Sequence, residues 1–256
     1  MTAARRLPVP SVLCAVRDGV AWLTLDRARS GNTLDATVLG DLAAACAAVD
    51  DRDDVRVVVL AANGRVFSRG LPRGVAWPAP RWPDAVDAVA RVRKPVIACL
   101  QGEAVGLGAS LALACDLRVG TPRASLALPE VPAGRLPGGG ATQRLARLVG
   151  PARALDVVLL GRRVDAREML AWGLLHEVVP AAKLAGTAAR LAGELARRGP
   201  LAVRLAKEAV LRALDLPLDD GIRLEHDLYV LLQTTADRRE GVAAFRERRP
   251  ARFTGR

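Results

Sequence analysis

The chain has 256 residues, of which 51% are hydrophobic and 25% charged, and it carries a formal net charge of +11. This length suits one domain, alone or with an appendage, and excludes two independent enzymes, since single hydrophobic cores stop growing near roughly 250–300 residues. No apolar run reaches the ~20 residues that a membrane-spanning helix needs. The arginines are scattered among acidic residues and aromatic residues make up only 3% of the chain, which excludes a nucleic-acid partner and leaves a phosphate-bearing small molecule to account for the charge.

The first part of the chain predicts a β-hairpin followed by a β-α-β unit. Two early prolines stand where a secretory signal would have its apolar segment, so we expect a cytoplasmic protein. Apolar runs at 12–16 and 20–25 flank an Asp-Gly pair that is typical of a tight turn. Apolar residues at helical spacing over 39–49 then precede a β-branched run at 55–60, which is typical of a buried strand.

The middle of the chain repeats this pattern with shorter elements. An apolar strand at 95–100 ends in a glycine-bearing loop that leads into a helix at 109–115. Short strands are then expected at 117–119 and 125–127.

From about residue 150 the pattern becomes helical, with glycine and proline as punctuation. The sequence predicts helices at 152–160, 165–172, 183–197, 201–214, 219–232 and 238–248. We therefore divide the chain into an α/β core, residues 1–195, and a C-terminal helical region, residues 196–256.

Four widely spaced cysteines lie in apolar segments: Cys14, Cys46, Cys99 and Cys115. This spacing predicts reduced core residues, and it suits neither a disulfide framework nor a metal site.

Several motifs, taken in their order and spacing, resemble the crotonase (enoyl-CoA hydratase/isomerase) superfamily. The match is dense between Trp22 and Pro180 and continues in pieces to Arg256. It rests on Thr24-Leu25-Asp26-Arg27, Asn32-Thr33-Leu34, 63–70, 94–98, 102, 106–108, 111–118, Pro129-Glu130, 139–145, 173–180 and 237–245. The resemblance implies a spiral of β-β-α turns whose C-terminal helical region builds a homotrimer or a homohexamer.

The resemblance also implies two main-chain donors that hold a thioester carbonyl as it becomes an enolate. By position these are the N–H groups of Leu71 and Leu107. The substrate loops carry Gly70, Gly106 and Gly108, which let the backbone approach a ligand. The implied partner is an acyl-CoA or a carrier-protein thioester, with coenzyme A as part of the substrate and no cofactor, metal or membrane involved.

Hydratases of this superfamily carry two glutamates, and this chain retains one of them, Glu130; the other position is Ser110. A serine is no carboxylate base at neutral pH, so the pattern favours double-bond isomerisation by Glu130 alone. Ser110 is left as either a helix-packing residue or one that holds water or substrate. Hydration, hydratase-lyase cleavage and decarboxylation remain alternatives. The hydratase-lyase lineage uses a tyrosine of the C-terminal helical region, and Tyr229 lies one residue away from the matching position.

Other departures from the superfamily pattern concern the acyl pocket and the class of protein. Pro72 stands where an aspartate is usual in the superfamily, and the following segment with Trp77 and Trp82 is short. The identity of the acyl group therefore cannot be inferred from relatives. A second interpretation is an accessory subunit that keeps the fold and binds without turnover.

A serine hydrolase is a third interpretation, with Ser110 in a degenerate nucleophile elbow and His176 or His226 as its partner. A dinucleotide fold is disfavoured because Gly106 and Gly108 lack the third glycine of that motif.

Overall fold

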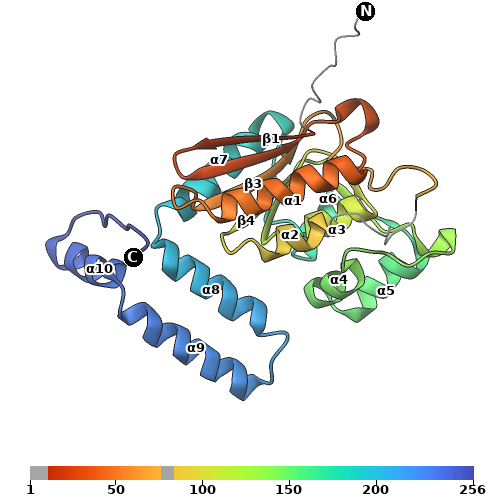
Figure 1. Ribbon diagram of the computed structural model, residues 1–256. Helices are drawn as coiled ribbons and strands as arrows, with labels where there is room; N and C mark the ends of the chain where they lie inside the picture. The colour runs from red at the N-terminus through yellow and green to blue at the C-terminus, as the bar shows by residue number, and fades with distance from the viewer. Residues whose placement is uncertain (1–10, 76–83) are drawn as a thin grey trace, which may run out of the picture.

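The computed structural model describes residues 11–75 and 84–256 (Figure 1). The expectations for Pro8 and Pro10, and for Trp77 and Trp82, lie outside the described residues. The structure is a mixed α/β fold with a set of C-terminal helices, as the sequence predicts, and its strands form two sheets.

The larger sheet has six strands in the order β1-β2-β3-β4-β6-β9. The hairpin of β1 (Val12–Arg17) and β2 (Val20–Leu25) is antiparallel, and its turn places Asp18 and Gly19 at φ 51° and 77°. Strands β3 (Val57–Ala62), β4 (Val96–Leu100), β6 (Leu117–Gly120) and β9 (Glu177–Val178) continue the sheet in parallel.

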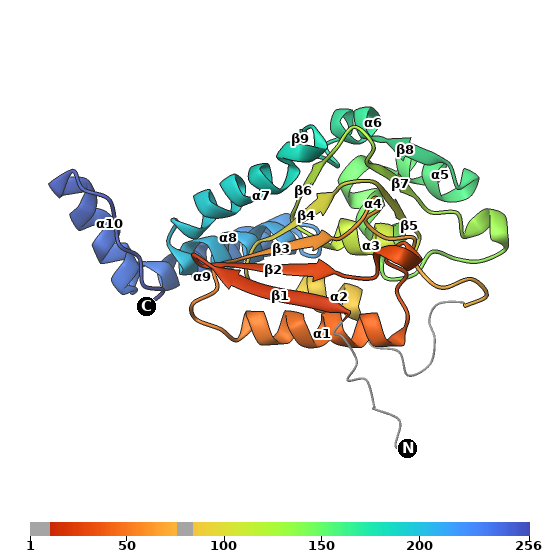
Figure 2. The same ribbon diagram turned by 90° about the horizontal axis from the view of Figure 1, so that it is seen from above.

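Helices cover both faces of this sheet (Figure 2). Alternate side chains of β3 point to opposite faces: Val58 and Leu60 join the core under α1 (Ala36–Asp50), and Val57 and Val59 join a second cluster under α7 (Ala181–Ala196). Burial on both faces explains why the parallel strands read as continuous apolar runs.

The smaller sheet contains β5 (Glu103–Val105), β7 (Ser125–Ala127) and β8 (Arg163–Asp165), in that order. Successive turns of the chain alternate between the two sheets: β4 is followed by β5 and α3 (Leu107–Ala114), then β6 by β7. This is the expected spiral of β-β-α turns, and residues of the loops after β3, β5 and β7 line one cavity.

The remaining helices are α2 (Ala85–Arg91), α4 (Ala141–Val149), α5 (Pro151–Leu160) and α6 (Ala166–Ala171), with short 3-10 turns η1 (Ala28–Ser30) and η2 (Val131–Ala133). Helices α2 and α4 were not expected from the sequence. The helix expected at 165–172 begins one residue later, because Asp165 ends the short strand β8 and is the N-cap of α6.

The C-terminal helices are α8 (Pro200–Arg212), α9 (Leu218–Gln233) and α10 (Ala236–Glu247). In both views α10 projects beyond the two sheets (Figures 1 and 2). Lys207 ties α8 to the core: its Nζ lies 2.6 Å from Asp116 Oδ2 and donates to the carbonyls of Val92 and Lys94. The division of the chain at residue 195 stays a prediction.

Cysteine placement differs from the expectation at one position. Cys46, Cys99 and Cys115 are buried and free, and burial raises the pKa of the Cys46 and Cys99 thiols to about 12. Cys14 is exposed on β1, the edge strand of the larger sheet, of whose six residues only Val12 is buried. Within the described residues no helix is long and apolar enough to cross a bilayer.

Candidate active site

The first of two glycine-bearing loops follows β3 and runs beside β5. Ser68 forms a parallel bridge with Ala104, and the N–H of Val105 donates to the carbonyl of Ser68 at 2.9 Å. Gly70 then adopts φ +75°, and a Cβ on it would lie 2.5 Å from the Val105 oxygen and 3.2 Å from the Leu107 nitrogen. Only glycine permits this approach, which brings Leu71 beside the second loop.

The second loop connects β5 to α3 through Gly106, which has φ 55° and ψ −122°. Leu107 is the first residue of α3, so its N–H belongs to the helix end that has no intrahelical acceptor. The positive end of the helix dipole adds to the field there. Among the described residues, neither the Leu71 nor the Leu107 N–H donates to a protein acceptor.

Gly108 packs against the first loop, since a Cβ on it would lie 2.7 Å from both the Cβ and the carbonyl oxygen of Ser68. Side chains at either glycine would push the loops apart. Gly70 and Gly108 therefore hold the two donor loops in contact.

Glu130 lies on the third loop, after β7, and faces the second donor. A Cβ on Gly106 would lie only 2.5 Å from Glu130 Oε1, which places the carboxyl against the Gly106 backbone next to Leu107. The other oxygen, Oε2, is buried and has no hydrogen-bond partner in the described part of the chain. Burial raises the pKa of the Glu130 carboxyl, opposed by its own backbone hydrogen bond and by the Arg135 guanidinium.

These groups line one cavity of about 210 Å³. Leu71, Leu107, Gly106 and Glu130 face it, so the structure brings together the two expected donors and the expected carboxyl. Its other walls are Arg69, Pro72, Arg73, Gly74, Val75, Val105, Pro129, Arg135, Leu136 and Gly138.

Ser110 lies outside the lining of this cavity, on α3. It is 1% exposed, and its hydroxyl is within hydrogen-bond distance of the Gly106 carbonyl at 3.2 Å and the Gly138 carbonyl at 2.9 Å. The side chain thus fastens the loop before α4 to α3. This contact favours the interpretation of Ser110 as a packing residue.

The serine hydrolase interpretation has no support in this geometry. Both hydrogen-bond acceptors of Ser110 are main-chain carbonyls. His176 instead accepts from the Arg118 N–H at 3.4 Å, and His226 is exposed on α9. Tyr229 is also exposed on α9.

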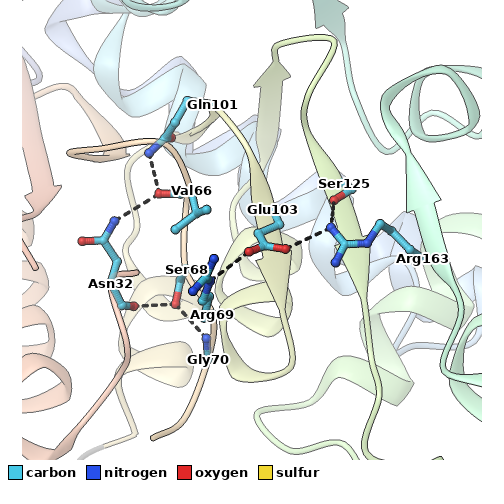
Figure 3. Close-up of polar contacts among 9 residues, drawn as sticks. All are labelled: Asn32, Val66, Ser68, Arg69, Gly70, Gln101, Glu103, Ser125 and Arg163. Carbon is cyan, nitrogen blue, oxygen red and sulfur yellow. Dashed lines mark hydrogen bonds and ion pairs between the residues drawn. The ribbon is translucent and has the colours of Figure 1, made fainter. Parts of the chain in front are cut away.

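A buried polar network, which was not predicted from the sequence, holds the first loop (Figure 3). The Ser68 hydroxyl donates to the Asn32 carbonyl at 2.7 Å and accepts from the Gly70 N–H at 3.1 Å. The Asn32 amide and the Gln101 amide both donate to the Val66 carbonyl, at 3.1 and 2.7 Å. Asn32 and Ser68 belong to the superfamily motifs, and their polarity within apolar surroundings was the available signal of a structural role.

The architecture of alternating sheets with paired glycine loops defines the class of the chain, the crotonase-like α/β proteins. A family model described as "Enoyl-CoA hydratase/isomerase" matches residues 15–256. The chain belongs to the enoyl-CoA hydratase/isomerase family, whose members are enzymes.

Individual relatives extend the match over nearly the whole chain. An (E)-benzylidenesuccinyl-CoA hydratase of Thauera aromatica is 36% identical, covering 95% of this chain and 99% of that protein. A 2,3-dehydroadipyl-CoA hydratase of Escherichia coli is 34% identical, covering 93% and 96%. The crystal structure of an enoyl-CoA hydratase from Bacillus anthracis superimposes with a TM-score of 0.91 at 34% identity, covering 96% and 100%.

Proposed function

We propose that the enzyme isomerises the double bond of an enoyl thioester, using one carboxyl group and two main-chain donors. The observation that carries the proposal is the carboxyl of Glu130, the one acidic residue of the cavity lining, whose Oε2 is buried without a hydrogen-bond partner among the described residues. It lies beside the N–H groups of Leu71 and Leu107, which donate to no acceptor in the described part of the chain. Donors fixed in a partly buried cavity stabilise negative charge on an oxygen without reorganising during the reaction.

In the proposed reaction the Glu130 carboxylate removes a proton from C2 of a 3-enoyl thioester. The electron pair of the broken C–H bond passes into the dienolate and then forms the C2–C3 double bond as the thioester is restored. The electron pair of the former C3–C4 double bond takes up the proton that the carboxyl returns, forming the new C4–H bond. The intermediate dienolate oxygen is held by Leu71 and Leu107. A carboxyl whose pKa is raised by burial is a stronger base than an exposed carboxylate, which suits both the removal and the return of the proton.

Hydration is the second candidate, favoured by the hydratase names of the relatives. Two-carboxylate addition of water needs a second group to hold the water, and the matching residue, Ser110, is bonded to two carbonyls outside the cavity lining. Hydratase-lyase cleavage and decarboxylation share the enolate and remain alternatives. The accessory-subunit interpretation is less favoured, since the family is enzymatic and the cavity keeps its donors and its carboxyl.

The proposal is tested with 3-enoyl, 2-enoyl, 3-hydroxyacyl and malonyl thioesters in deuterated water, followed by mass spectrometry. Isomerisation exchanges hydrogen for deuterium without adding water, whereas hydration adds one water. Glu130→Gln is expected to preserve thioester binding and lower turnover by about 10²–10⁴-fold. Ser110→Ala is the matched control with a milder loss, and a silent Glu130→Gln beside an inactive Ser110→Ala would reverse the assignment.

We also propose self-association through the C-terminal helices. Neither α8 nor α9 buries a residue within the chain. Their exposed apolar side chains include Val210 at 70%, Leu218 at 78% and Ile222 at 55%, and Phe245 on α10 is 85% exposed. Apolar stripes of this kind are covered by a partner in stable proteins. Light scattering should find a homotrimer or a homohexamer, and a monomer at micromolar concentration would contradict the proposal.

The proposed reaction is acid-base chemistry on a thioester and requires no cofactor beyond the coenzyme A or carrier of the substrate. A cytoplasmic location stays a prediction.

A further inference from the structure

The acyl side of the cavity is rimmed by arginine. The lining contains three arginines, Arg69, Arg73 and Arg135, and one acidic residue, Glu130. Arg69 pairs with Glu103 at 2.9 Å. Arg73 and Arg135 have no carboxylate partner among residues 11–75 and 84–256.

Backbone geometry fixes Arg73 at the corner of a tight turn that follows the first donor directly. The N–H of Val75 donates to the Pro72 carbonyl at 3.2 Å, and Gly74 has φ +80°. This arrangement is a four-residue turn with glycine where a left-handed conformation is needed. The Arg73 side chain is exposed at the rim of the cavity.

Arg135 is held on the opposite wall by the loop that carries the carboxyl. Its N–H donates to the Glu130 carbonyl at 2.9 Å, which closes the η2 turn between them. Its guanidinium Nη1 donates to the Val75 carbonyl at 3.2 Å, across the cavity. This contact brings Arg135 to the turn that carries Arg73, and it is the one hydrogen bond of the Arg135 guanidinium within residues 11–75 and 84–256.

The position of Glu130 decides which end of the substrate meets these arginines. In the proposed reaction the carboxyl must reach carbons of the acyl chain, so the acyl group lies on the Glu130 side of the two donors and coenzyme A leads away from it. Arg135 stands at the end of the Glu130 loop, and the apolar walls beside it are Val75 and Leu136. An acyl chain leaving the carboxyl therefore passes apolar side chains and ends at guanidinium groups.

We propose that the substrate is an acyl thioester whose chain carries a second anionic group, a carboxylate, distal to the thioester and bound by Arg135 with Arg73. This inference rests on the proposed function and names its substrate class. Arginine matches a carboxylate in planar geometry with two parallel hydrogen bonds, and a cleft lined by one sign of charge raises the local concentration of the opposite ion. A neutral acyl chain would offer these exposed guanidinium groups no anionic partner.

The test compares saturated thioesters, which bind without reacting: adipyl-CoA, its ω-amide counterpart and hexanoyl-CoA, by calorimetry on the full chain. The carboxylate is expected to bind about 10- to 100-fold more tightly than the amide, the range of hydrogen bonds to charged groups. Arg73→Gln/Arg135→Gln should abolish this preference with little change in hexanoyl-CoA binding. Arg123→Gln/Arg167→Gln removes the same charge from exposed positions outside the cavity lining and should keep it.

Phosphates of coenzyme A are the other anions these arginines could meet, and N-acetylcysteamine thioesters of the same acyl groups lack them. Persistence of the carboxylate preference in these thioesters supports the proposal. The proposal is wrong if the double variant weakens all CoA thioesters equally and leaves the N-acetylcysteamine thioesters unaffected. Equal binding of carboxylate and amide by the wild type overturns this inference alone, whereas no binding of any thioester overturns the proposed function with it.

Discussion

Replacing Gly106 by alanine tests the contact between the second donor loop and Glu130. At φ 55° and ψ −122° an alanine is strained whatever space it has, at a cost of about 1–3 kcal/mol. Its Cβ would also lie 2.5 Å from Glu130 Oε1. That oxygen is the far end of a flexible side chain, so the carboxyl rotates away while the backbone stays nearly in place.

The expected result is therefore a modest loss of stability with a large loss of turnover. The strain corresponds to a melting temperature about 2–10 °C lower for a chain of this size. Displacing the acid-base group lowers turnover by about 10²–10⁴-fold.

Gly173→Ala is the matched control, because Gly173 has φ +75° and no described atom lies within 4 Å of where an alanine Cβ would stand. It should lose about 1–2 kcal/mol and keep full turnover. Melting curves and steady-state kinetics on both variants separate the two effects. If Gly106→Ala retained the turnover of Gly173→Ala, the packing of Glu130 against this loop would have no part in the reaction.

Three further predictions follow from charges in and around the core. Burial raises the folded-state pKa of Glu130, so the contribution of this carboxyl to stability is fully present below its unfolded pKa and is lost as pH rises through the folded value. Glu130→Gln should therefore raise the melting temperature at neutral pH, and the difference from wild type should vanish in acid. A lower melting temperature of the variant at neutral pH would contradict this. Arg135 lowers the pKa of Glu130, so Arg135→Gln should move the acid limb of the rate profile to higher pH, and a limb that moves down would refute the coupling. Lys207→Met removes the ion-pair partner of Asp116, whose side chain is only 20% exposed. Chemical denaturation should therefore show a free energy of unfolding lower by about 3 kcal/mol. An unchanged free energy of unfolding would mean that other contacts hold α8.

The fold was predictable where the residue pattern repeats with one period. The hairpin, α1, β3, β4, α3 and the helices after residue 150 were all expected, with boundaries within a few residues. The strand expected from residue 55 begins at Val57, because Val55 is buried but lies before the ladder. Helix α2 has only seven residues, which is too short for a clear helical periodicity. Helix α4 directly follows three glycines that are typical of a loop, so its start was not recognised from the sequence.

The location of the candidate site was implied by the family resemblance, the roles of its residues stay a prediction, and the backbone explains why its glycines are needed. Glycines at 70, 106 and 108 mark places where a Cβ would collide with the facing loop, and this requirement survives in the sequence as a fixed spacing. The pairing of Arg73 and Arg135 at the cavity was not predictable, since the two residues lie far apart in the chain. The contact of Arg135 with the Val75 carbonyl, two residues after Arg73, is what connects them in the structure. One sequence also contains no signal that separates these two arginines from the many exposed ones.

The same backbone constraints explain why leucines can stand at both donor positions and why the side chains around them decide the chemistry. A donor N–H is present on every residue except proline, so Leu71 and Leu107 supply it as well as glycine would. What differs is the space near α3: a Cβ on Gly139 would lie 3.1 Å from the Ser110 Cβ and 2.9 Å from the Leu107 side chain. The loop before α4 thus closes directly over Ser110, and a second carboxyl at that position would have to displace it. A single carboxyl that both takes and returns the proton is the chemistry that this closed packing favours.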